Sequence, residues 1–133
     1  MKQYIIFIIT LFVCYYTTYS QTYNLDAATN GQTYVTCDAT LYDSGGPTTD
    51  YANNESYEIT FQTSGTGCIR AVIDDYDIEW NWDFLYFYDG PSSASPQISS
   101  KVHGYPQVNG SNRNEIGNAY YAQSGYITIR FTS

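Results

Sequence analysis

Hydrophobic and polar residues alternate with a period of two along much of this chain, and helical periodicity is nearly absent. Every second residue is apolar in the segment Tyr57–Gln62, and the segment Ile127–Thr132 has the same pattern. Such alternation is typical of strands that bury one face and expose the other. We therefore predict a half-buried β-strand in each segment.

Three further segments have strand character without this alternation. The run Phe84–Tyr88 is apolar and aromatic throughout, which predicts a strand covered on both faces, and turn residues follow it. The segments Ile69–Ile73 and, more weakly, Ile98–Val102 predict further strands. Clusters of Gly, Ser and Asn separate these segments. We therefore expect an all-β fold, with the strands in an antiparallel sandwich of two sheets.

The first twenty residues have the pattern of an export signal. Lys2 precedes the apolar stretch Tyr4–Val13, and small residues precede a cleavage position ahead of Gln21. The stretch is too short to favour a membrane-spanning helix. We therefore expect a secreted, extracellular protein whose mature chain does not insert into a membrane. The predicted organisation is a signal peptide over 1–20, an N-terminal lead-in over 21–35 and one domain over 36–133.

Charge and cysteine content narrow the choice of partners and compartment. The net charge of −8 becomes one unit more negative when Lys2 is removed. This charge argues against nucleic acid and anionic membranes, and it favours basic partners or bound cations. Signal removal also takes away Cys14 and leaves Cys37 and Cys68. A cysteine pair in an exported chain predicts one disulfide, worth about 3 kcal/mol; two buried free thiols are the alternative.

Two composite motifs resemble those of the CUB domain. Tyr42–Gly46 (YDSGG) is followed by Tyr51–Tyr57 (YANNESY), and Tyr76–Glu79 (YDIE) is followed by Asp83–Gly90 (DFLYFYDG). An alternating apolar segment then closes the chain.

The resemblance extends over about residues 36–133. It implies a CUB-type jelly-roll sandwich in which Cys37 is bonded to Cys68. Animal CUB domains usually carry a second disulfide near the segment 80–82, where this chain has no cysteine. That departure is closer to the CUB-like modules of large secreted bacterial proteins. Because the chain stops in the alternating segment at Ser133, the resemblance also implies that the last strand of the domain is missing.

An acidic segment is the candidate binding site. Acids gather within sixteen positions, at Asp74, Asp75, Asp77, Glu79, Asp83 and Asp89. Crowded carboxylates raise one another's pKa or bind a cation, and an oxygen-rich extracellular cluster suits Ca²⁺. The resemblance to calcium-binding CUB domains implies Glu79 and Asp83 as metal ligands, with a third acid expected just after Ser133. A solvated acidic surface is the alternative, and we expect Asp89 to be only a turn residue.

Two tryptophans flank the same segment. We expect Trp82 to pack beside Phe84, whereas Trp80, with Asp77, is a candidate contact for a ligand; core packing of Trp80 is the alternative. The resemblance implies that calcium-held carboxylates bind a lysine of an extracellular protein partner. The predicted function is a secreted, non-catalytic module for Ca²⁺-assisted protein interaction or adhesion. Carbohydrate (glycan) binding, or targeting within a larger secreted hydrolase, are the alternatives.

Catalysis is not expected from this segment. The single histidine, His103, lies in a glycine-containing loop without a neighbouring cysteine or nucleophile motif. The chain has no glycine-rich phosphate loop, metalloprotease helix motif or G-x-S-x-G sequence. Glu79 and Asp83 are the acid/base pair one would consider, and no substrate cleft is predicted around them.

Overall fold

The computed structural model describes residues 20–103 and 115–133, and every helix or strand in these ranges is a β-strand. The all-β prediction is therefore confirmed. In chain order the strands are β1 Gln21–Asn24, β2 Gln32–Thr36, β3 Ala39–Tyr42, β4 Ser56–Thr63, β5 Ile69–Val72, β6 Phe84–Asp89, β7 Ala119–Ala122 and β8 Tyr126–Thr132. Within this part of the chain there is no helix that could cross a membrane.

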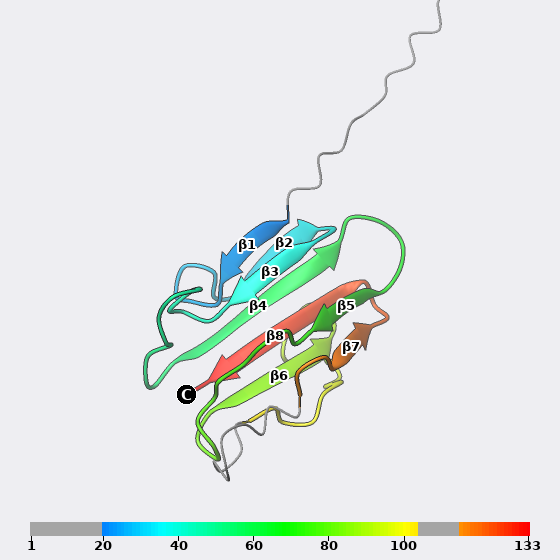
Figure 1. The fold of residues 1–133 in the computed structure, drawn as a ribbon. Helices are drawn as coiled ribbons and strands as arrows, with labels where there is room; N and C mark the ends of the chain where they lie inside the picture. The colour runs from blue at the N-terminus through cyan, green and yellow to red at the C-terminus, as the bar shows by residue number, and fades with distance from the viewer. Residues whose placement is uncertain (1–19, 104–114) are drawn as a thin grey trace, which may run out of the picture.

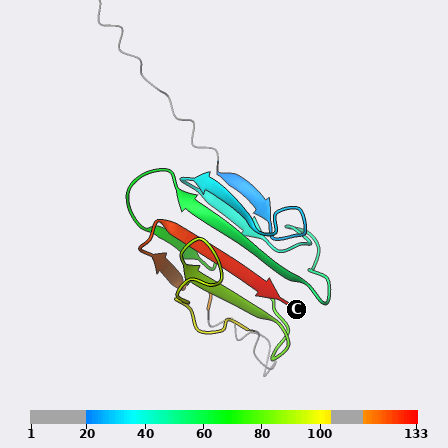
Figure 2. The ribbon, with the colours of Figure 1, turned by 180° about the vertical axis from the view of Figure 1, so that it is seen from behind.

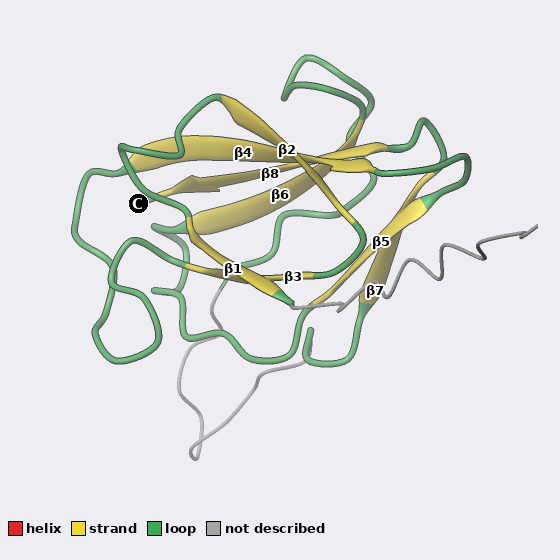
Figure 3. Cartoon of the chain, turned by 90° about the horizontal axis from the view of Figure 1, so that it is seen from above, coloured by secondary structure: helices red, strands yellow, loops and turns green. Residues whose placement is uncertain are grey.

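The strands form three sheets, where the sequence predicted two. One sheet has four strands in the order β2-β4-β8-β6, and the other two are the pairs β1-β3 and β5-β7. Figure 1 shows the four-stranded sheet running diagonally through the molecule. Seen from above in Figure 3, both two-stranded sheets lie on one side of it, which makes a second layer. This layering is consistent with a β-sandwich.

The pairing is mixed, so the prediction of a purely antiparallel sandwich is wrong. β1 runs parallel to β3, with Gln21 opposite Ala39, and β2 runs parallel to β4, with Gln32 opposite Ile59. The remaining pairs, β4-β8, β6-β8 and β5-β7, are antiparallel. Parallel neighbours need a crossover connection, and β3 supplies it by taking the chain through the other layer between β2 and β4.

The residues that alternate in the sequence form the centre of the core. Ile59 is 0% exposed and Ile127 is 2% exposed, and antiparallel pairing places Ile59 opposite Ile129 and Phe61 opposite Ile127. Full burial of one such side chain contributes about 1.5–3 kcal/mol to folding. Both alternating segments are thus confirmed as strands with their apolar faces inward.

The opposite face of the central strands is partly covered as well. Thr128 is fully buried, and its hydroxyl donates a hydrogen bond of 2.8 Å to the carbonyl of Gly90 and lies 2.7 Å from the hydroxyl of Thr60. The view from behind in Figure 2 shows the segment after β6 crossing this face. Polar residues here satisfy one another and a loop carbonyl, so they can be buried without an unpaired group.

The remaining strand predictions have a mixed outcome. β5 and β6 are confirmed, whereas the predicted strand at 98–102 is wrong. That segment makes one isolated bridge, between Leu85 and Val102, and a second bridge pairs Tyr88 with Gln97 just before it. Between them the hydroxyl of Ser99 accepts the hydrogen bond of the Phe87 amide at 3.0 Å. A side chain therefore replaces the backbone partner that a continuous ladder would need.

The predicted signal peptide lies outside the described residues except for Ser20. β1 begins at Gln21, the residue that follows the predicted cleavage position. The segment expected as a lead-in, 21–35, contributes β1 and most of β2 to the two layers.

The predicted disulfide is not formed in the structure. Cys37 and Cys68 are both free thiols, and both are exposed, so the alternative of two buried thiols is not met either. The sulfur of Cys37 lies 2.7 Å from the hydroxyl of Ser64. Ser64 begins the loop after β4, and Cys68 is at the far end of that loop, immediately before β5. The loop thus presents Ser64, and not Cys68, to Cys37.

Candidate functional site

A tight turn over residues 77–83, which we name the tryptophan turn, joins the segment after β5 to β6. The amide of Asp83 donates a hydrogen bond of 3.3 Å to the carbonyl of Glu79 and closes the turn. Asn81 at its tip has a φ of 66°, a left-handed conformation that Asn tolerates better than most residues. Ile78 is 8% exposed and anchors the beginning of the turn in the core.

Tyr51 holds the turn from the side. Its hydroxyl donates a hydrogen bond of 2.5 Å to Oδ2 of Asp83 and accepts one of 3.0 Å from the amide of Glu79. Its ring makes an edge-on contact with Phe131, with 4.8 Å between the ring centroids. Burial, and then the hydrogen bond to Asp83, raises the pKa of the Tyr51 hydroxyl well above its ordinary value. The hydroxyl therefore stays protonated and keeps donating to the carboxylate.

The sequence did not predict the role of Tyr51. Tyr51 opens the YANNESY motif, 32 residues before Asp83. A buried acid needs a donor, but the sequence does not indicate which hydroxyl provides it. The position of Tyr51 in the YANNESY motif was the only feature of the sequence that pointed to this residue.

The two predicted metal ligands lie in different environments. Asp83 is 5% exposed and faces Tyr51, whereas Glu79 is exposed and meets the same hydroxyl only through its backbone amide. Across residues 20–103 and 115–133 no group of three or more His, Cys, Asp or Glu side chains is arranged to hold a metal. Ca²⁺ takes six to eight oxygens. Within the described residues, Glu79 and Asp83 are therefore not part of a cluster of three or more such side chains.

Both tryptophans are exposed, Trp80 by 46% and Trp82 by 74%. The expectation that Trp82 packs beside Phe84 is wrong. Asp83 points inward to Tyr51, which directs the preceding side chain outward. The ring of Phe84 instead lies beneath the ammonium group of Lys101, 4.5 Å from the ring centroid. Trp80 is exposed, as the ligand-contact hypothesis for it requires.

The remaining acids of the segment divide into two groups. Asp77 is exposed on the tryptophan turn, and Asp74 is exposed before it. Asp89 lies at the end of β6, where its carboxylate accepts hydrogen bonds from the amides of Gln123 and Ser124 at 3.0 and 2.9 Å. Hydrogen bonds from Ser124 and Gln123 lower the pKa of Asp89. Asp89 thus secures the turn between β7 and β8, in line with the structural role expected for it.

The tryptophan turn therefore carries two exposed indoles and two exposed carboxylates. Tyr51 holds its backbone, Ile78 and Asp83 face the protein, and the other charged and aromatic side chains are exposed. Exposed aromatic surface with an acidic rim is suited to binding, because aromatic groups supply contact area and carboxylates supply charged acceptors.

Comparison with known proteins leaves the family open. The sequence matches no family model and no curated protein.

Proposed function

We propose that this chain is a secreted, non-catalytic binding module. Its tryptophan turn binds lysine side chains of an extracellular partner protein. The observation that carries the proposal is the exposure of Trp80 and Trp82 beside the carboxylates of Asp77 and Glu79. Aromatic residues are enriched at protein interfaces, and Trp is among the residues that most often dominate binding energy there.

A lysine ammonium group fits both parts of this surface. Carboxylates accept charge-assisted hydrogen bonds from it, and an indole face attracts a cation by about 0.5–1 kcal/mol at an exposed site. The net charge of −8 would draw basic partners toward the surface. Tyr51 supports the proposal because a turn that is ordered before binding loses less entropy on binding.

The fold proposed for the module is the CUB-like jelly-roll sandwich. The two layers of strands and the motifs YDSGG, YANNESY and DFLYFYDG support it. Such a scaffold presents its loops at the ends of the layers, where the tryptophan turn lies.

Intrinsic fluorescence provides a direct test, because Trp80 and Trp82 are the only two tryptophans of the chain. A peptide with several lysines should change this fluorescence saturably, and the same peptide with acetylated lysines should not. Trp82→Ala, with Trp80 left as the reporter, should weaken binding roughly two- to fivefold. Val35→Ala is the matched control, since Val35 is 58% exposed on β2, away from the turn. Equal binding of both peptides would refute lysine recognition.

Calcium assistance through Glu79 and Asp83 remains a prediction. Thermal melts in EDTA and in millimolar Ca²⁺ test it. Ca²⁺ at ten times its dissociation constant would stabilise the fold by about 1.4 kcal/mol. A midpoint that is the same in both conditions would remove calcium from the proposal.

Glycan binding is the second candidate, and the observation that favours it is the outward-facing indole of Trp82. Sugars stack on exposed aromatic faces without needing a positive charge. A glycan array probed with the wild-type protein and with Trp82→Ala separates the two candidates. Glycan signals that Trp82→Ala abolishes, without any response to the lysine peptide, would favour the carbohydrate reading.

A further inference from the structure

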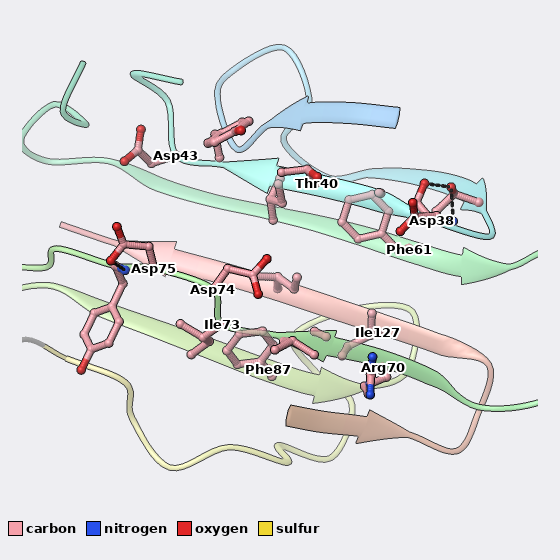
Figure 4. Close-up of a pocket in the computed structure, with 18 of the residues that line it drawn as sticks. Asp38, Thr40, Asp43, Phe61, Arg70, Ile73, Asp74, Asp75, Phe87 and Ile127 are labelled. Carbon is pink, nitrogen blue, oxygen red and sulfur yellow. Dashed lines mark hydrogen bonds between the residues drawn. The ribbon is translucent and has the colours of Figure 1, made fainter. Parts of the chain in front are cut away.

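A second surface lies between the two small sheets and shares only Asp77 with the tryptophan turn. A cavity of about 790 Å³ opens between β3 and β5. Its floor is apolar and comes from the four-stranded sheet, with Phe61, Phe87 and Ile127 among the floor residues. Figure 4 shows Thr40 on one side of the opening, Arg70 and the chain of β5 on the other, and the floor residues between them. We name this cavity the acceptor groove.

Both walls of the acceptor groove are strand edges. β3 pairs with β1 on its far side, and β5 pairs with β7 on its far side. Among the described residues no backbone hydrogen bond joins β3 to β5. An edge of this kind presents N–H and C=O groups that can pair with another strand. The groove therefore has two such edges facing one space.

The two edges run in the same direction. In Figure 4 the labelled residues Asp38, Thr40 and Asp43 follow one another from right to left, and so do Arg70 and Ile73. One strand inserted between them can therefore be antiparallel to both, which is the slightly more stable form of pairing. Since β3 and β5 have four residues each, about five residues of an extended chain would span the groove at roughly 3.3 Å per residue.

The floor specifies an alternating sequence for such a strand. Every second side chain of a strand points to the same face, so one set would point toward the floor and pack between the half-buried Leu41 and Ala71 of the walls. The other set would point outward, beside Thr40 and Arg70, which are both exposed on the walls. Apolar residues at alternate positions, with polar residues between them, match this arrangement.

Charge sets the direction of the strand. The charged residues that line the groove are one cation, Arg70, and five acids, Asp38, Asp43, Asp74, Asp75 and Asp77. Four of the acids follow the ends of β3 and β5, whereas Asp38 precedes β3. A strand antiparallel to both edges would begin at the end where the four acids gather. Basic residues therefore belong at its N-terminal end.

We propose that the acceptor groove binds an extended peptide segment of a partner protein, inserted as a strand antiparallel to both β3 and β5. The segment carries basic residues first and then alternating apolar residues that face the floor between Leu41 and Ala71. Insertion would join the two small sheets into one continuous layer by strand addition.

The probe is a synthetic peptide with two lysines, followed by alternating Val and Thr and an amidated C-terminus. Calorimetry should detect binding, and hydrogen exchange should show new protection of amides in both 39–42 and 69–72. N-methylation of either alternate set of peptide amides should weaken binding more than about tenfold, because each set pairs with one wall. A peptide of the same composition with its Val and Thr residues in blocks is the control for alternation.

Two matched protein variants test the direction. Asp74→Asn removes a charge at the acidic end, and Asp38→Asn removes one at the opposite end. The first should weaken binding roughly 1.5- to fivefold, and the second should leave it unchanged. Trp82 does not line the groove, so Trp82→Ala should leave the peptide-induced protection of the amides in 39–42 and 69–72 unchanged. Failure of this proposal can thus be distinguished from failure of lysine binding at the tryptophan turn.

Several results would overturn the proposal. N-methylated and unmodified peptides that bind alike would exclude strand pairing, and protection of one wall alone would exclude insertion. If the amides of both walls are already protected in the free protein and lose that protection on dilution, a second copy of the chain occupies the groove instead. Protection that is independent of dilution would mean that the chain's own residues fill it.

Discussion

Substitution of Tyr51 by Phe removes one oxygen atom and leaves the ring packed on Phe131. The lost hydroxyl donates to Oδ2 of Asp83 at 2.5 Å and accepts from the amide of Glu79 at 3.0 Å. A hydrogen bond to a charged group contributes about 1.5–3 kcal/mol, and a neutral one about 1 kcal/mol. Asp83 is only 5% exposed, so water replaces the lost donor poorly. We expect Tyr51→Phe to lower the free energy of unfolding by about 2.5–4 kcal/mol.

Urea unfolding followed by tryptophan fluorescence measures this change, and a domain of this size should also lose roughly 10 °C in melting midpoint. Tyr121→Phe is the matched control, because the Tyr121 side chain is 53% exposed on β7. A double-mutant cycle with Asp83→Asn should give a coupling energy above about 1 kcal/mol for residues in direct contact. If Tyr51→Phe stays within about 0.5 kcal/mol of the wild type, as surface changes usually do, the assignment of Tyr51 as the support of the turn is wrong.

Three further predictions concern the scaffold. Gly45→Ala would place a Cβ 2.7 Å from a backbone carbonyl carbon and should lower the free energy of unfolding, measured in urea, by about 1–3 kcal/mol. Gly65→Ala is the control, because its Cβ would meet no atom within 4 Å and stability should change little. Equal losses of stability in the two variants would contradict this prediction. Because the pKa of Asp89 is lowered on folding, the stability it contributes is present above its unfolded pKa near 3.9 and is lost as the pH falls through its lower folded pKa. The difference in stability between the wild type and Asp89→Asn should therefore shrink below about pH 4, and a difference that persists at lower pH would refute the linkage. Since Cys37 and Cys68 are exposed free thiols, iodoacetamide should alkylate both in the native protein without reductant. If mass spectrometry finds both unmodified until a reductant is added, the two cysteines form the predicted disulfide after all.

Local pattern was sufficient for the two long strands at the centre of the core. The alternation around Ile59 and Ile129 predicted β4 and β8 because a period of two in the sequence is the period of a strand. The same reasoning did not find β1, β2, β3 and β7, which are short and carry few alternating apolar residues. The side chain of Val35 on β2, for example, is 58% exposed. The apolar residues of β2 therefore do not mark a buried face, and the alternation that identifies a strand is missing there.

The sequence indicated which segment carries the candidate site, but it did not predict how the side chains of that segment are arranged. The acidic segment indicated where to look, and Trp80 is exposed as the ligand hypothesis requires. The pairing of Asp83 with Tyr51 and the outward position of Trp82 depend on which side chain of the turn meets the core. That choice involves residues 32 positions apart, so no local pattern contains it.

The sequence by itself determined the all-β class and the strands at the centre of the core, because strand formation and burial follow from nearest-neighbour periodicity. Only the tertiary structure decided the parallel pairing of β1 with β3 and of β2 with β4, the support of the tryptophan turn by Tyr51, and the opening between β3 and β5. Each of these depends on contacts between segments that are distant in the chain, and such contacts are set by how the layers pack together.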